Sequence, residues 1–476
     1  MSFYQPFRSF SRHEGLPFAD LLSESVINKI AEEVGVDVAK EEEDGILYTT
    51  PVTLWAFLSQ MLFKDEQRSC VAAVARVITL CIALNREPPS PDTGTYCRAR
   101  ARLPVALVQR MTTHVAEAGE AQVPNDWLWK NRHVYLVDGT TVSTPDTPEL
   151  QKKYPQPDSQ KEGLGFPMIR MVVLMSLATA MLTGMAQGPY AGKETGETAL
   201  FRELLDRLKA GDVVLADRYY CSYFMIALLK ERNIDAVFRL HQARTADFTK
   251  GKRLGSGDHI VTWHRPDRPE WMSQEVYDRM PLTLEVREVM VRVSQPGFRE
   301  DSLIVVTTMT DSSEYSKDDL AELYHKRWLV ELDIGVLKVR LGLGVLRTTS
   351  PAMARKELWV GLLAYNLIRQ SLLQAASLRE LSPRQLSFTA AMQSVASTWS
   401  VLAIVSQEIA TKLIEAHLHA IGTHKIGHRF GRVEPRAIKR RPKPQALLTK
   451  PRQEARAELL KGRSAAASET TESAAE

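Results

Sequence analysis

Cysteine is scarce in this chain of 476 residues, which holds only four. Their positions form no Cys-x-x-Cys pair and no spacing typical of a zinc site. The scarcity argues against a disulfide-stabilised secreted protein, and it predicts reduced, mostly buried thiols in a cytoplasmic protein. The four cysteines are Cys70, Cys81, Cys97 and Cys221.

Long apolar runs are missing as well. The most apolar stretch, residues 171–185, is interrupted by Ser176, Thr179, Thr183 and Gly184. It is short for a membrane span, so we expect two buried strands there and no membrane partner. The first fifteen residues lack the apolar centre of a signal peptide.

A large excess of one charge is also absent, because the formal net charge is only +4. The total therefore does not imply nucleic acid. Basic residues do gather in 436–463, where several prolines argue against a packed element. Such a run is typical of a mobile phosphate-seeking arm, and a solubilising tail fits the composition equally well. We expect the Ser/Ala/Glu-rich end of this 436–476 tail to be disordered.

Four polar residues, Tyr324, Arg327, Glu331 and Lys338, share one predicted helix. At about 100° per residue they fall on one face. The other side chains are largely apolar, which predicts a helix buried nearly all round with its polar stripe facing an internal site. A carboxylate between two cations suits a site that handles phosphate and a metal. A solvated face with i,i+4 ion pairs is the alternative.

From residue 133 onward, strands and helices alternate. The order is three strands, a helix, a strand, a helix and a strand, as expected of an RNase H-like mixed α/β sheet flanked by helices. The pattern breaks between 241 and 302, where alternating stretches predict an inserted β-rich subdomain. Core-strand texture then returns, and Ser316 resembles the N-cap of the helix that carries the polar stripe. The predicted strands are 133–138, 168–177, 181–187, 212–217, 235–240 and 303–309, and the helices between them are 198–208 and 222–231.

The regions on either side are predicted to be helical. Arg98, Arg100 and Arg102 precede the last N-terminal helix, where they could touch a DNA backbone or form a solvated helix entry. We expect an acidic loop at 40–44 and a turn-rich segment at 87–95. The predicted helices are 17–34, 51–63, 69–85 and 103–118, then 352–376 and 383–419. The predicted division is an N-terminal domain suited to DNA ends (1–125), a core (126–245 and 302–375), an insertion (246–301), a C-terminal helical region (376–435) and the tail.

Asp138 and Asp217 each end a predicted apolar strand. Functional groups gather at the carboxyl ends of strands in open α/β sheets. Together with Glu331, these aspartates would form a cluster of hard oxygen ligands that selects Mg²⁺ or Mn²⁺ and needs a metal to offset its repulsion. Taken alone, each aspartate is more simply a turn residue or a helix cap.

Three motifs in this order resemble those of DDE transposases of the bacterial insertion-sequence-four family: VDGTTV at Asp138, LADRYYCS at Asp217 and the Tyr/Arg/Glu/Lys helix. The likeness spans roughly residues 133–370. It implies an RNase H-like core with a β-strand insertion, and two Mg²⁺ ions (Mn²⁺ may substitute) on Asp138, Asp217 and Glu331. It also implies that Tyr324, Arg327 and Lys338 bind phosphate. A further similar segment contains Glu357, Tyr365, Asn366 and Arg369.

The resemblance implies cut-and-paste transposition of the chain's own element. The expected partners are double-stranded DNA, at the terminal inverted repeats and at the target, and a second copy in a synaptic homodimer. A bacterial, nucleoid-associated cytoplasmic location follows. The family also suggests a hairpin intermediate, with a flipped base stacked on Trp263 or Trp271, although a core role is the commoner one for either. The alternatives are a non-cutting DNA-binding protein derived from a transposase and an RNase H-like nuclease.

Weaker candidates for DNA contact are Arg218, Arg239 and Lys161. Arg218 could instead pair with a neighbouring acid, Arg239 is similar, and Lys161 lies in a loop expected at the same end of the sheet. Four histidines also cluster near the C-terminus without zinc spacing, and we assign them to a helix end. They are His417, His419, His424 and His428.

Overall fold

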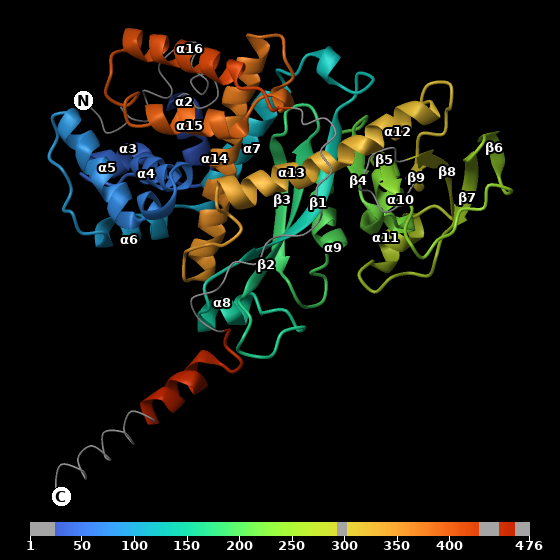
Figure 1. Cartoon of the computed structure of the whole chain (residues 1–476), viewed down its shortest axis with the longest axis horizontal. Helices are drawn as coiled ribbons and strands as arrows, with labels where there is room; N and C mark the ends of the chain where they lie inside the picture. Colours follow the sequence, from blue (N-terminus) through green and yellow to red (C-terminus); the bar gives the residue numbers. More distant parts are fainter. Residues whose placement is uncertain (1–23, 293–301, 428–446, 462–476) are drawn as a thin grey trace, which may run out of the picture.

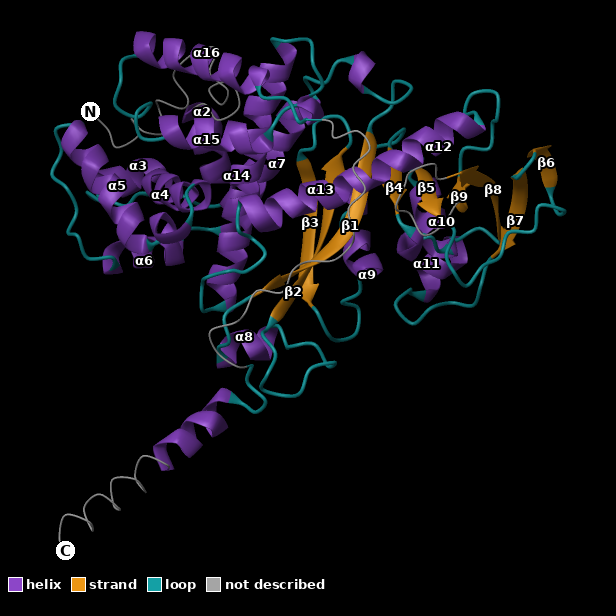
Figure 2. Cartoon of the chain, in the orientation of Figure 1, coloured by secondary structure: helices purple, strands orange, loops and turns teal. Residues whose placement is uncertain are grey.

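The computed structural model describes residues 24–292, 302–427 and 447–461 (Figure 1). Within them, nine strands form one mixed sheet in the order β3-β2-β1-β4-β5-β9-β8-β7-β6. Figure 2 shows the sheet between a large group of helices and the smaller helices α9, α10 and α11. The strands are β1 (Val134–Ser143), β2 (Met168–Ser176), β3 (Leu182–Pro189), β4 (Val213–Ala216), β5 (Asp235–Arg239), β6 (Lys252–Gly255), β7 (Asp258–His264), β8 (Thr283–Arg292) and β9 (Ser302–Thr307).

The first five strands confirm the predicted RNase H-like order. β1, β2 and β3 form an antiparallel meander, while β4 and β5 run parallel to β1. Successive side chains of β1 and β4 enter different cores: Leu136 and Leu215 join one, Val137 and Ala216 the other. Burial on both faces explains why these strands are continuous apolar runs in the sequence.

The β-rich insertion extends this same sheet. β8 lies antiparallel to β9, and β7 and β6 follow outward as hairpin-connected strands. Arg287 in β8 is completely buried and forms two hydrogen bonds, of 2.8 and 2.6 Å, with the carboxylate of Asp258 in β7. The insertion is therefore β-rich as predicted, and its strands are continuous with the core sheet through β9.

The N-terminal region is helical as predicted, and the turn-rich segment 87–95 is mostly loop as expected, but the expected acidic loop is mostly a helix. α3 covers most of the acidic segment 40–44, and α6 carries the arginines that were expected before a helix. Tyr96 and Ala99 of α6 are buried three residues apart, so packing of this inner face holds the helix against the core. The helices are α2 (Glu24–Glu33), α3 (Val38–Glu43), α4 (Thr50–Leu62), α5 (Cys70–Ala83), α6 (Gly94–Arg102) and α7 (Val105–Glu120).

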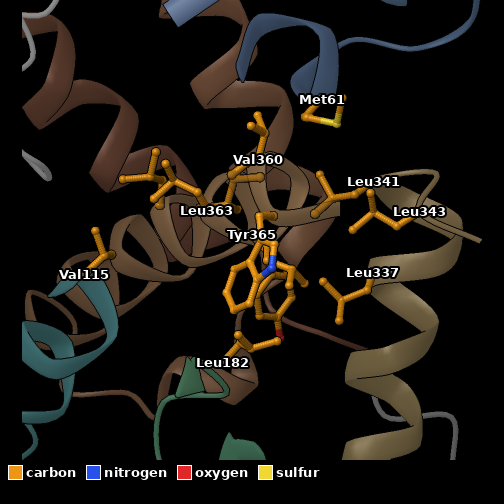
Figure 3. Packing of buried hydrophobic residues seen from close by; sticks show 14 of the residues in the cluster. Met61, Val115, Leu182, Leu337, Leu341, Leu343, Val360, Leu363 and Tyr365 are labelled. Carbon is orange, nitrogen blue, oxygen red and sulfur yellow. The ribbon is translucent and has the colours of Figure 1, made fainter. Parts of the chain in front are cut away.

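Helix α14 (Pro351–Ser377) is the centre of the helical layer, and α4, α7, α15 and α16 all pack on it. Figure 3 shows side chains from the N-terminal helices (Met61 and Val115) and from the sheet (Leu182) gathered around Tyr365 of α14. The predicted helix 383–419 is in fact divided into a short 3₁₀ turn, α15 (Phe388–Thr398) and α16 (Gln407–Thr423). Ser406 caps α16 by accepting a hydrogen bond from the backbone of Ile409, so a new helix starts there.

The shorter helices flank the sheet or connect its strands. They are α8 (Pro148–Lys153), α9 (Glu197–Arg202), α10 (Tyr223–Glu231), α11 (Gln274–Arg279), α12 (Lys317–His325) and α13 (Leu329–Gly335). No helix in the described part of the chain is long and apolar enough to cross a membrane. The four cysteines are free thiols, as predicted.

Residues 436–446 and 462–476 of the predicted tail, the start of the predicted helix 17–34 and His428 lie outside the described residues. Within this tail, residues 452–461 form a helix, which was not expected in a proline-containing run. This helix projects away from the body in Figure 1, and most of its side chains are exposed, so it is not packed on the core.

Candidate active site

The sheet register places Asp138 beside Asp217. Val137 of β1 is opposite Ala216 of β4 in a parallel pair, and each aspartate is the next residue of its strand or strand end. Side chains alternate along a strand, so both aspartates lie on the face opposite Val137 and Ala216. That is the face on which α13 crosses β1.

Asp138 does not end its strand, contrary to the sequence-based expectation. β1 continues to Ser143, because its second half still pairs with β2 after β4 has ended at Ala216. Asp217 does follow its strand directly, and its carboxylate accepts a hydrogen bond of 2.8 Å from the Tyr219 N–H as a helix cap. Asp217 is therefore a helix cap, as the simpler explanation of this residue proposed, and it also lies beside Asp138.

The signature helix, residues 317–340, crosses the sheet above these aspartates (Figure 2). Its N-cap is Ser316, which forms the predicted capping box with Asp319. The helix is not regular: α12 passes into a 3₁₀ turn at Lys326–Trp328, then α13, then a π turn at Val336–Arg340. Such turns change the rotation per residue and are frequent at functional sites.

The helix is buried on one face only, so the expectation of burial nearly all round was wrong. Trp328 is 43% exposed, Leu332 55% and Val339 70%, whereas Tyr324 is 7% exposed. The inner apolar residues Val330 and Leu337 pack into the core beneath the helix. The helix lies as a single layer on the sheet, and no described element covers its outer apolar side chains.

The polar stripe does face the sheet. The Lys338 ammonium donates a hydrogen bond of 3.2 Å to the Thr140 hydroxyl, two residues beyond Asp138. Arg327 forms an ion pair of 2.8 Å with Glu331 in the next turn. Their side chains are 17% and 35% exposed, respectively, so this pair is shielded from solvent on one side rather than fully solvated. The predicted stripe that faces inward and the alternative of an i,i+4 ion pair therefore occur together on this helix.

Asp138 is electrostatically unusual. Burial raises the pKa of its carboxyl from 3.8 to about 7. The Gly139 N–H and Arg327 oppose this rise, while Asp217 and Glu197 add to it through like-charge repulsion. Tyr324 lies in the same field, since burial raises its pKa and both Arg327 and Asp217 act on it. A carboxyl whose pKa is raised toward 7 by burial among other acids is typical of a functional site.

Glu197, the first residue of α9, is a further acid at this site that the sequence reasoning missed. Burial raises its pKa, and Asp217 raises it further. A Cβ at position 139 would lie 2.1 Å from the Glu197 Cδ, so Gly139 leaves room for this carboxylate beside Asp138. The available signal was an acid opening the helix that precedes the Asp217 strand.

The donor chemistry of this site fits a divalent metal. Asp138 and Asp217 supply the hard oxygens that Mg²⁺ and Mn²⁺ prefer, and they repel each other without a cation. Within the described residues, no three Asp, Glu, His or Cys side chains converge closely enough to hold an ion as they stand. Glu331, the expected third ligand, has its carboxylate on Arg327.

The signature helix is anchored from the C-terminal side. Asp333, two residues beyond Glu331, is 2% exposed, and each of its carboxylate oxygens accepts a hydrogen bond from a different arginine. Arg369 of α14 lies at 2.8 Å and Arg384 at 2.9 Å. Arg384 also donates to the backbone carbonyl of Ser176 at the end of β2. Helix, sheet and C-terminal region are therefore joined at one buried carboxylate.

The other residues of the later similar segment have structural contacts. The Tyr365 hydroxyl donates to the Ala180 carbonyl, and the Asn366 side chain bonds both backbone groups of Leu182. Glu357 accepts from the backbone N–H groups of Arg347 and Thr348. These contacts fix α14 against the β2–β3 turn and the loop before α14.

The weaker DNA-contact candidates separate in the structure. Arg218 is exposed beside Asp217, and the expected alternative, an ion pair with a neighbouring acid, is not found among the described residues. Arg239 ends β5 and acts electrostatically on Tyr324. Lys161 is exposed in the loop that follows α8.

Of the two tryptophans, Trp263 is a core residue. It is 5% exposed, its indole N–H donates to Glu288, and Arg244 covers its ring at 3.9 Å. Trp271 is half-buried under Arg202 and lines a cavity of about 420 Å³ with Tyr219. His417, His419 and His424 lie along and at the end of α16, as predicted.

Comparison with known proteins supports the family resemblance that the three sequence motifs indicate. The family described as "Transposase DDE domain" matches residues 129–367. The transposase InsG for insertion sequence element IS4 of Escherichia coli (strain K12) is 26% identical over 397 residues, which cover 82% of this chain and 85% of that protein. InsZ of the same organism is 27% identical over 138 residues, covering 28% of this chain and 44% of InsZ.

Among solved structures, the piggyBac transposase synaptic complex with hairpin DNA aligns with 88% of this chain and 86% of that one. The TM-score is 0.42 at 11% identity. The family match covers half of the chain and includes Asp138, Asp217 and the signature helix. This chain therefore belongs to the transposase DDE domain family, as an IS4-family DNA transposase that catalyses DNA cleavage and strand transfer.

Proposed function

We propose that this transposase moves its own insertion sequence by a cut-and-paste route, with Asp138, Asp217 and Glu331 as its catalytic carboxylates. One observation carries the proposal: the parallel β1–β4 register sets the two aspartates side by side under the helix that bears Glu331. Lys338 of the same helix bonds Thr140 of β1, which ties that helix to the strand of Asp138.

Transposases of this family generally use a divalent metal. We infer that the three carboxylates hold two Mg²⁺ ions, for which Mn²⁺ can substitute. Bound there, the ions would activate the attacking hydroxyl and stabilise the leaving oxygen. Glu331 must exchange its bond with Arg327 to join the two aspartates. The exchange would free the Arg327 guanidinium for a DNA phosphate, so one side-chain movement prepares both groups.

The cationic residues would position the DNA strand. Arg327 offers a planar fork to phosphate oxygens and Lys338 a point charge near Asp138, while Tyr324 presents a hydroxyl beside Asp217. Water would attack the phosphorus at the transposon end, and the 3′ oxygen would leave and take up a proton. The resulting 3′-OH would then attack a target phosphodiester, forming a new P–O bond as the target's 3′ oxygen leaves.

DNA is the partner implied by the family. We propose that it is bound as terminal inverted repeats and as target, with the N-terminal domain, residues 1–125, contributing to end recognition. Two ends must be joined, so we infer a homodimer in the cytoplasm at the nucleoid. If a base is flipped during cleavage, Trp271 is the better platform, because Trp263 is buried whereas Trp271 is partly exposed and lines a cavity.

The test is Mg²⁺-dependent cleavage and joining of duplex DNA that carries the element's ends. Asp138→Asn and Glu331→Gln should reduce cleavage by at least about a hundredfold, as expected when a metal ligand is lost. Glu322→Gln is the matched control, since Glu322 is on the same helix but is 70% exposed and paired with Lys326. Normal cleavage by the Asp138 variant would refute the assignment. Cleavage without joining would favour the nuclease alternative.

A further inference from the structure

A second basic site lies where α4, the start of α5 and the start of α14 meet. A cavity of about 300 Å³ is lined there by three guanidinium groups and one carboxylate. None of these residues belongs to the proposed catalytic set. They are Arg68, Arg100, Arg347 and Glu357.

The three arginines have weak or neutral partners. Arg68 donates to the Leu341 carbonyl at 2.9 Å, Arg100 to Gln60 at 3.0 Å and Arg347 to the Asp65 carbonyl at 3.3 Å. No described carboxylate forms an ion pair with any of them. In addition, the buried Nε atoms of Arg68 and Arg100 find no acceptor among the described residues. Several donor positions are thus left for a ligand.

Glu357 offsets only part of this positive charge, since one carboxylate faces three guanidinium groups. It forms no ion pair with any of the three arginines and accepts hydrogen bonds from three other donors, the backbone N–H groups of Arg347 and Thr348 and the Thr348 hydroxyl, at 2.9–3.2 Å. This holds the loop that presents Arg347. Burial lowers the pKa of Arg68, Glu357 and Asp65 oppose this change, and Arg347 adds to it.

Two long helices also begin at the cavity. Ser69 and Cys70 at the N-terminus of α5 line it, as do Thr349 and Met353 at the N-terminus of α14. The positive end of each helix dipole therefore points toward the same space as the arginines. Three guanidinium groups and two helix N-termini therefore line one cavity, a combination of donors that suits an anion.

We propose that this cavity binds a backbone phosphate of the DNA, which rests on the proposed function as a DNA transposase. The loop 341–349 leads directly from Lys338 to Arg347, and Arg68 contacts the Leu341 carbonyl at its start. Arg347 and Thr349 are exposed at the rim, where a duplex can reach them. A DNA strand held by Lys338 would thereby gain a second phosphate contact, in the cavity between the N-terminal helices and α14.

The experiment measures the affinity of the full chain for a fluorescein-labelled 30-base-pair duplex in EDTA, from 50 to 200 mM KCl. Each lost phosphate contact should reduce the slope of log K against log salt by about 0.9, which is about 3.5-fold in affinity over this range. Arg347→Gln should show this reduction and Arg347→Lys should restore most of the slope. Arg110→Gln is the matched control, because Arg110 is an exposed arginine paired with Glu33 and Glu117.

A second pair of variants guards against misfolding. Thr349→Glu adds a carboxylate at the rim and should reproduce the loss of slope, while Thr349→Gln should not. Wild-type slopes in both Arg347→Gln and Thr349→Glu would overturn the proposal. Stabilisation by inorganic phosphate that disappears in Arg347→Gln, with an unchanged duplex slope, would also overturn it and assign the site to free phosphate. Because no cleavage is needed, a failed cleavage assay with a changed slope would refute the proposed function and leave this site standing.

Discussion

Replacing Asp138 by asparagine should stabilise the metal-free protein at pH 8 while abolishing its activity. The carboxyl has a pKa of about 7 in the folded protein, against an ordinary value of 3.8, mainly because it is buried. The folded state therefore binds more protons than the unfolded state between these values. The free energy of unfolding falls as pH rises from about 4 to about 7 and stays low above that range. Asparagine cannot ionise, and its side-chain oxygen can still accept the hydrogen bond that Asp138 takes from the Gly139 N–H.

The size of the gain follows from the same values. At 1.36 kcal/mol per pKa unit, the rise from 3.8 to about 7 corresponds to about 4 kcal/mol as an upper bound. Relaxation and water penetration soften such burial costs, so we expect about 2 kcal/mol at pH 8. At pH 5 most of the folded-state carboxyl is protonated, and the expected gain falls to about 0.8 kcal/mol.

Urea unfolding in EDTA at pH 5 and pH 8 measures both values. Asp126→Asn, at an exposed aspartate, serves as the control and should change neither. Adding Mg²⁺ at a hundred times its dissociation constant should raise the wild type by about 2.7 kcal/mol but not the Asp138 variant. A loss of stability at pH 8, or an equal gain at both pH values, would refute the reasoning.

Three other predictions concern the same region. Gly139→Ala should lower the free energy of unfolding by about 1–2 kcal/mol, because the new Cβ would meet the Glu197 carboxylate. The double variant Gly139→Ala/Glu197→Ala should recover most of this loss, as measured by urea unfolding. Asp333→Asn should cost about 3–5 kcal/mol by leaving two buried arginines short of a counter-charge, and equal melting curves would contradict this. At Mg²⁺ well below its dissociation constant, metal-dependent cleavage should fall about tenfold per pH unit below about pH 7, because a proton on Asp138 competes with the metal, and a flat profile from pH 5 to 8 under this condition would exclude that role.

The sequence was sufficient to predict the strand order and the pairing of Asp138 with Asp217. Strands that are buried on both faces are continuous apolar runs in the sequence. An aspartate follows each of the two runs, and both aspartates lie at the point where β4 ends. The sequence was not sufficient to show that β1 runs on past Asp138. The following residues, Thr140 to Val142, have good strand propensity, and their pairing with β2 is a tertiary contact.

The departures along the signature helix have a similar cause. A periodicity of 100° per residue assumes one regular helix, and the 3₁₀ and π turns come from fitting the helix across a twisted sheet. Glu197 was missed because no motif surrounds it, and its contact with Gly139 joins segments 58 residues apart along the chain. Arg68, Arg100 and Arg347 likewise meet only through tertiary packing.

The double clamp on Asp333 has a consequence for how such an element decays. A gene interrupted between codons 370 and 384 would still encode every signature residue, but its product would lose Arg384, one of the two arginines that hold the carboxylate two residues from Glu331. An inspection of the motifs alone would classify this copy as intact. Its helix at Glu331 would nevertheless be less firmly anchored, because Asp333 would have lost one of its two arginines. Loss of transposition can thus begin at the far end of the reading frame, well before a catalytic codon changes.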